Sequence, residues 1–243
     1  MDNNNTQYYE YNNPANTAGK AGGRTLDVEN SVMVQTFIFM TLALLISAAA
    51  AWITISSPNL LYAILFNSGT LWILIIAEFA LVIGCNAMVA RDKTAAGIVL
   101  FVLYAAVNGM TLSVIFLVFQ LSSIVQVFVI SAATFAIAAV FGAVTKKDLT
   151  RMGSLCMMGL FGIIVAGIIN LFMQNTMLDF GICAIGVVIF IGLTAYDVNK
   201  IKAMSQQKAY TSVTSLAIFG AMTLYLDFIN LFLKLLRLFG KRN

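Results

Sequence analysis

Histidine is absent from the 243-residue sequence, and cysteine and proline are scarce, with three and two residues. Without histidine, the chain lacks the Ser-His pair of a serine protease and the histidine ligands of a membrane-embedded zinc hydrolase. Cys85, Cys156 and Cys183 lie in apolar stretches and show no paired spacing, so they predict neither a disulfide framework nor a zinc site. We therefore do not expect an enzyme.

Charge is scarce as well: 10% of the residues are charged, 60% are hydrophobic, and the mean hydropathy is +0.92. Such a chain cannot cover a water-soluble globule with an ordinary charged surface. A helix needs about 20 apolar residues to cross a bilayer. Seven stretches of that kind lie at about 32–55, 71–90, 95–117, 124–144, 155–174, 180–199 and 214–238. The predicted fold class is an all-α integral membrane protein with seven transmembrane helices.

The residues outside these stretches leave no room for a soluble domain. Residues 1–31 are rich in Asn, Gly, Thr and Tyr and hold almost no aliphatic side chains, which indicates a disordered tail. The first apolar run starts beyond residue 30 and has the length of a full span, so we expect no cleavable signal peptide. The predicted domains are a tail at 1–31 and a transmembrane domain at 32–243.

The basic residues predict the orientation, because Lys and Arg beside spans are retained in the cytoplasm. Ten of the fourteen lie in the tail and in the second, fourth and sixth connections: Lys20, Arg24, Arg91, Lys93, Lys146, Lys147, Arg151, Lys200, Lys202 and Lys208. The N-terminus is therefore expected in the cytoplasm. Seven full crossings then leave Lys234, Arg237, Lys241 and Arg242 outside, against the same rule. A re-entrant last segment would avoid this, but we favour seven crossings.

Three acidic residues lie within the predicted spans, where an ionised carboxylate is costly unless it is paired or used. Glu78 is in the middle of the second span, Asp197 is near the cytoplasmic end of the sixth, and Asp227 is inside the seventh. Each alone could form a salt bridge that packs two helices. Three acids cannot all be neutralised in this way, since no basic residue lies at comparable depth.

Unpaired acids leave three physical options: a bound proton, a bound cation or a water-filled cavity. Two carboxylates brought close together cannot both ionise cheaply and titrate as a unit, which would make them a pH switch. Their oxygens are also the hard ligands that Ca²⁺ prefers. The amide side chains of Asn108, Asn199 and Asn230 are candidates to complete such a site.

Several segments make the chain resemble bacterial members of the transmembrane Bax-inhibitor-motif family. They are GLTAYDVNKIK, LYLDFINLFLKLLRLFG, NGMTLS at 108–113 and TKKDLTRMGSLCMMGLFGII at 145–164, together with the acid at Glu78. The resemblance covers nearly all seven spans. It implies six helices wrapped around a central seventh, a pH-sensitive calcium leak and a location in the bacterial inner membrane. It also implies that Asp197 and Asp227 form the gating pair and its calcium ligands, with Glu78 close by.

The same resemblance implies a basic residue near the cytoplasmic end of the second span that pairs with the sixth-helix aspartate in the closed state. The candidate for this latch is Arg91, although its distance from Glu78 in the sequence is slightly longer than in the family pattern. Protonation of the aspartates would break the pairing and change the leak. The expected partners are the lipid bilayer, protons and calcium as the transported ion, with no cofactor and no nucleic acid.

Two other functions stay open on the sequence alone. In the first, the protein does not conduct but regulates a membrane partner such as a quality-control protease, and the acids hold the bundle together. In the second, it is a proton-coupled exchanger, which would show obligatory counter-transport. Neutralising both aspartates would change ion flux in a leak, but only partner binding or stability in a regulator.

Overall fold

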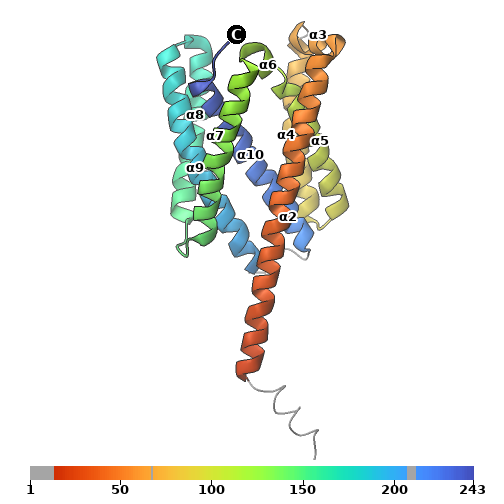
Figure 1. Cartoon of the computed structure of the whole chain (residues 1–243), viewed down its shortest axis with the longest axis vertical. Coiled ribbons are helices and arrows are strands. Elements are labelled where there is room, and N and C mark those ends of the chain that lie inside the picture. The colour runs from red at the N-terminus through yellow and green to blue at the C-terminus, as the bar shows by residue number, and fades with distance from the viewer. Residues whose placement is uncertain (1–13, 67, 207–211) are drawn as a thin grey trace, which may run out of the picture.

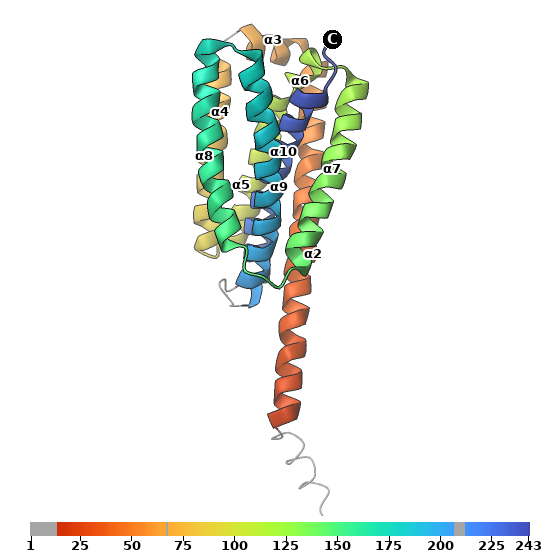
Figure 2. The same cartoon turned by 90° about the vertical axis from the view of Figure 1, so that its left-hand side faces the viewer.

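The protein is a bundle of long helices (Figures 1 and 2). The computed structural model describes the backbone of residues 14–66, 68–206 and 212–243, and the side chains in these ranges from Val28 onward except at 65–68. No β-strand occurs within these ranges. The helices are α2 (Pro14–Ser56), α3 (Pro58–Phe66), α4 (Ser68–Ala90), α5 (Thr94–Leu112), α6 (Ile115–Val118), α7 (Leu121–Val144), α8 (Thr150–Met173), α9 (Thr176–Gln206) and α10 (Val213–Phe239).

Seven segments of these helices are long and apolar enough to cross a membrane, which confirms the predicted class and number of spans. Their bounds agree with the prediction to within a few residues at most ends. The main exception is α9, which continues to Gln206 rather than ending near residue 199. The connection between the first two spans contains the short helix α3, which begins at Pro58.

The first helix begins much earlier than the sequence predicts, at Pro14 rather than near residue 32. Proline suits the first turn of a helix, because its fixed φ matches the helix and its missing N–H would have no partner there. Extending an existing helix adds one hydrogen bond per residue without a new nucleation cost, even in a segment poor in aliphatic residues. Residues 14–31 thus differ from the expected disordered tail, and residues 1–13 lie outside the described range.

The seventh span, in α10, is the centre of the bundle. Of its most apolar 18-residue window 72% is buried, against 33% or less for the other spans. It packs against α2, α4, α5, α7 and α9, whereas α8 packs chiefly against α9. Its aromatic side chains contact those of its neighbours edge to face: Phe101 and Tyr104 pack on Tyr225, and Phe128 and Phe135 pack on Phe228. The expected central seventh helix is confirmed.

The start of α2 and the C-terminus lie at opposite ends of the structure (Figure 1), and we call these the N-terminal end and the C-terminal end of the bundle. Helix α10 is continuous and is long and apolar enough to cross a membrane, which supports seven crossings over a re-entrant last segment. The residues after α10 are hydrogen-bonded to the segment between α6 and α7. Gln120 N–H donates to the Lys241 carbonyl at 3.0 Å, and Asn243 N–H donates to the Val118 carbonyl at 3.0 Å.

Helices α7 and α9 are locked together at the N-terminal end of the bundle. Asn199 donates to the carbonyls of Gly142 and Thr145 at 3.3 and 3.4 Å, and Lys202 donates to the Ala143 carbonyl at 3.0 Å. These bonds satisfy carbonyls of the last turn of α7, which no helical N–H can reach. After this junction, Asp148 accepts hydrogen bonds from the Thr150 hydroxyl and N–H, and these bonds lower the pKa of that exposed carboxyl.

Gly142 permits this close approach, because a Cβ at that position would collide with the backbone carbonyl of Ala195 on α9. We expect Gly142→Ala to destabilise the protein by about 1–3 kcal/mol, since the two helices must move apart. Gly162→Ala is the matched control: a Cβ there meets open space, so helix propensity should leave stability unchanged or raise it by roughly 0.5–1 kcal/mol. Thermal unfolding in detergent would measure both, and equal stability of the two variants would contradict the packing argument.

Candidate functional site: a cavity that ends at two aspartates

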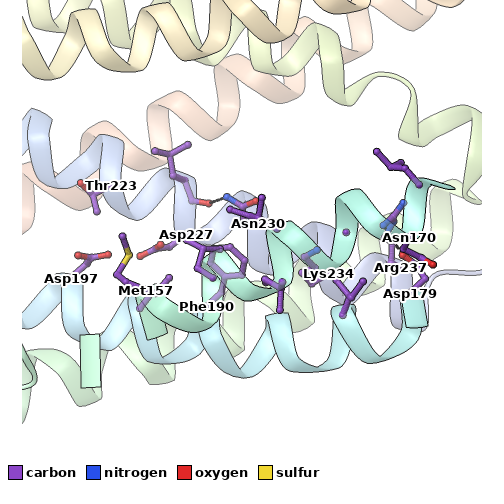
Figure 3. A pocket seen from close by; sticks show the side chains of 18 of the residues that line it. Met157, Asn170, Asp179, Phe190, Asp197, Thr223, Asp227, Asn230, Lys234 and Arg237 are labelled. Atoms are coloured by element: carbon purple, nitrogen blue, oxygen red, sulfur yellow. Dashed lines mark hydrogen bonds and ion pairs between the residues drawn. The ribbon is translucent and has the colours of Figure 1, made fainter. Parts of the chain in front are cut away.

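A cavity of about 780 Å³ separates α8 from the central helix α10. It begins at the C-terminal end of the bundle beside the α8–α9 turn, where Gln174 and Asn175 line it, and extends inward to Asp197 and Asp227. Its walls come from α8, α9 and α10, and α4 contributes Asn86. Figure 3 shows the polar side chains along its length. The cavity therefore connects one end of the bundle with acidic groups deep in the spans.

The two aspartates come together from different helices at the inner end of this cavity. Asp197 is on α9 and Asp227 on α10, and their side chains point toward each other within hydrogen-bonding range (Figure 3). Asp227 is 6% exposed, and its Oδ2 atom is buried with no hydrogen-bond partner among the described residues. Neither ion pair found among the described side chains involves these two acids. The predicted pair is thus brought together, without a basic partner in direct contact.

The base that interacts with Asp197 is Lys200, one helical turn away, rather than Arg91. The Lys200 ammonium group lies 5.8 Å from the ring centroids of Tyr196 on α9 and Phe219 on α10, and so bridges the two helices. Arg91 is exposed at the end of α4 and forms no ion pair with the residues whose side chains are described. The latch between Arg91 and Asp197 is not formed in this structure and stays a prediction.

Glu78 does not line the cavity, so the structure separates it from the aspartate pair. It interacts instead with Asn108 and Thr111 of α5, and its Oε1 atom is buried without a partner in the described part of the chain. The Tyr225 hydroxyl continues this cluster, donating to Asn108 Oδ1 at 2.9 Å and lying 2.7 Å from the Ser47 hydroxyl. Residues 225 and 227 point to different faces of a helix, which explains the separation.

Polar residues at helical spacing continue outward from Asp227 along the cavity face of α10. Asn230, Lys234 and Arg237 follow at intervals of three or four residues, which places them on one face. Arg237 forms an ion pair with Asp179 of α9 at 2.9 Å, close to the mouth. The sequence prediction missed these roles for Asp179, Lys234 and Arg237, although the helical spacing of Lys234 and Arg237 from Asp227 was a usable signal. Lys234 and Arg237, which the distribution of basic residues would place on the cytoplasmic side, thus line the cavity instead.

The chemistry of the pair suits a weakly held cation better than a resident metal. The described side chains contain no cluster of three or more His, Cys, Asp or Glu residues. Ca²⁺ takes six to eight oxygen ligands, so two carboxylates would need water and neutral oxygens to complete its shell. Thr223 and Asn230 line the cavity near the pair, whereas Asn108 and Asn199 lie elsewhere. Of the three predicted asparagines, the structure therefore retains Asn230 as a candidate ligand.

Comparison with known proteins identifies the family. Residues 29–243 match the family described as Bax1-I, inhibitor of apoptosis-promoting Bax1. The chain belongs to this Bax inhibitor family. Its relatives include the inner membrane protein YbhL of Escherichia coli, 41% identical over 213 residues, which covers 86% of this chain and 91% of YbhL. An uncharacterized protein of Borreliella burgdorferi is 41% identical over 217 residues, covering 88% of this chain and 94% of its own length.

The Bax inhibitor family assignment confirms the resemblance stated from the motifs, and it agrees with a multi-pass membrane protein. A more distant relative, an uncharacterized protein of Deinococcus radiodurans, is 34% identical over 226 residues, covering 90% of this chain and 94% of the relative. The matched region contains the cavity, both aspartates and all seven spans except the first residue of the first. The cavity and its aspartates therefore lie within the shared family region.

The cavity should be accessible to water from the C-terminal end. In a background with the native cysteines replaced by alanine, we expect Asn230→Cys to react with a membrane-impermeant thiol reagent, because residue 230 lines the cavity. Leu231→Cys is the matched control, since Leu231 is fully buried and does not line the cavity. Labelling measured by a mass shift should be fast at 230 and absent at 231. Equal protection at both positions would show that water does not reach the aspartates.

Proposed function

We propose that the protein is a pH-sensitive calcium leak of the bacterial inner membrane, gated by protonation of the Asp197–Asp227 pair. The observation that carries this proposal is a cavity of about 780 Å³ that ends at two carboxylates, neither of which forms an ion pair with a described basic side chain. An intramembrane carboxylate is costly and is retained where it pairs or takes part in ion transfer. The N-terminal end of the bundle is assigned to the cytoplasm, since most Lys and Arg residues beside spans lie there.

In this proposal, a cation enters from the outer face through the cavity and exchanges part of its water shell for the oxygens of the pair. A proton competes for the same oxygens, because metal ligands must be deprotonated. Calcium binding should therefore weaken as the pH falls. Two carboxyls within hydrogen-bonding range can hold one proton between them, and the pair then titrates as a unit. Proton binding and cation binding are thus alternative states of one site.

The proposed cycle takes this structure as its closed state, because described side chains between the pair and the cytoplasmic end are buried. Val198 and Ile201 of α9 and Ile218 of α10, which lie on the cytoplasmic side of the aspartates, are almost fully buried. Lys200 lies against Tyr196 and Phe219 at the same level. Cation–π contacts of this kind strengthen when water is excluded. Opening would require α9 and α10 to separate here. Protonation of Asp197 would remove its attraction for Lys200, and so would weaken an interaction at this level of the two helices.

Calcium uptake into liposomes that contain the purified protein tests this function. We expect wild-type flux to vary between about pH 6 and about pH 8, and Asp197→Asn or Asp227→Asn to remove most of that variation, since the remaining carboxyl no longer shares a proton with a second one. Glu78→Gln is the control, because Glu78 lies outside the cavity and should leave the pH dependence in place.

Three outcomes would contradict the proposal. Flux equal to that of empty liposomes, from protein that unfolds cooperatively, would favour a non-conducting regulator that binds a membrane partner such as a protease. Flux whose pH dependence survives both Asp variants would place the gate elsewhere. Loss of the pH dependence in Glu78→Gln alone would move the switch to the cluster around Tyr225.

A further inference from the structure

Among the side chains that the structure describes, Lys234 is the cavity-lining cation without a counter-ion. Five charged residues line the cavity: Asp179, Asp197, Asp227, Lys234 and Arg237. Asp179 and Arg237 form an ion pair at 2.9 Å. Asp197 and Asp227 face each other at the inner end of the cavity. Lys234 has no ion pair or hydrogen bond with the residues whose side chains are described. Figure 3 places it between Asn230 and the Arg237–Asp179 pair, on the route from the mouth to the aspartates.

The fold makes room for this side chain. The Cγ, Cδ and Cε atoms of Lys234 lie 3.2 Å from the position that a Cβ would take at Gly186 of α9. A larger residue at 186 would press on the stem and displace it, so the glycine lets the stem lie flat against α9. The stem is thereby held against the wall, and its charge is confined to the cavity. An apolar stem packed on protein with the charged group in a wet space is a common arrangement for lysine.

The position of this charge bears directly on cation entry. Lys234 is two helical turns from Asp227 on the same face, about 10.5 Å along the axis at 1.5 Å per residue. At that distance, in a partly buried space, two charges interact more strongly than in bulk water and are less screened by salt. A fixed positive charge there opposes the attraction of the aspartates for a cation. The opposition is twice as large for a divalent ion as for a monovalent ion, since Coulomb energy scales with valence.

We propose that Lys234 is a specificity-determining residue that keeps the occupancy of divalent cations at the aspartate pair low. This inference rests on the proposed entry of cations through the cavity. The lysine weakens calcium binding at the pair and slows calcium entry, so its removal should raise both calcium binding and calcium uptake. It also sets the preference between divalent and monovalent cations, through the field it adds rather than through direct coordination.

The decisive variant is Lys234→Met, which removes the charge and keeps an unbranched stem for the Gly186 surface. Two controls match it. Lys234→Arg keeps the charge at the same position, and Lys241→Met removes the same charge from the same end of the bundle, at an exposed residue outside the cavity. Thermal unfolding of all three in detergent verifies folding, and Lys234→Gln is a second neutral variant if Lys234→Met fails to fold.

The first measurement is equilibrium binding of radioactive calcium to the protein in nanodiscs, which does not depend on conduction. We expect Lys234→Met to bind calcium about tenfold more tightly than wild type, while Lys234→Arg and Lys241→Met stay within about twofold. Tightening by Lys234→Arg as well as by Lys234→Met would show that packing, and not charge, is responsible. Unchanged binding in Lys234→Met would overturn the inference.

The second measurement compares the uptake of calcium and rubidium into proteoliposomes. If the effect is electrostatic, a tenfold rise in calcium uptake should accompany only about a threefold rise for rubidium, because the logarithm of the change scales with valence. Equal factors for the two ions would indicate a widened path and would overturn the inference. No uptake by any variant, together with tighter calcium binding in Lys234→Met, would reject the proposed leak and leave the role of Lys234 intact. If the protein shows neither calcium uptake nor calcium binding, both the proposed leak and the proposed role of Lys234 are rejected.

Discussion

The burial of α10 at the centre of the bundle is the constraint on which the rest of the structure depends. One side of this helix carries Leu224, Tyr225, Phe228 and Leu231, which are buried against the surrounding helices. Another side carries Asp227, Asn230 and Lys234, which line the cavity. Polar groups inside a bilayer must be satisfied or hydrated, so this side cannot be covered by a tightly packed apolar helix. The gap between α8 and α10 follows directly from that requirement.

The other helices fall into two groups, those that pack on the apolar side of α10 and the one that encloses the cavity. Helices α2, α5, α7 and α9 hold the apolar surface of α10, with glycines where two backbones approach, as at Gly109 beside Ser47 and Gly142 beside Ala195. Helix α8 packs chiefly on α9 and forms the outer wall of the cavity. Small residues at such contacts are the usual means of packing helices where lipid removes the hydrophobic driving force. Close packing on one side of α10 and a cavity on the other are thus built by different helices.

Much of this arrangement could be read from the sequence. Seven apolar stretches predicted the spans, because hydropathy and length report directly on the bilayer, and the motifs around Asp197 and Asp227 predicted both the family and the pair. The position of Glu78 could not be predicted, since a span assignment gives the depth of a residue but not the direction its side chain faces. The sequence prediction placed Lys200 in the connection after the sixth span. Helix α9 in fact continues to Gln206, so Lys200 is helical and lies beside Phe219 of α10.

The order of the helices along the chain has a consequence for biosynthesis. The helix at the centre follows the other six spans in the sequence, so a ribosome makes it after them. Until it inserts, the earlier helices have no partner for the surfaces that later cover α10, and lipid or one another must occupy that space. Insertion of each span and packing between spans are separable steps in a membrane. Assembly of this protein is therefore completed from the outside inward, by the insertion of its central helix.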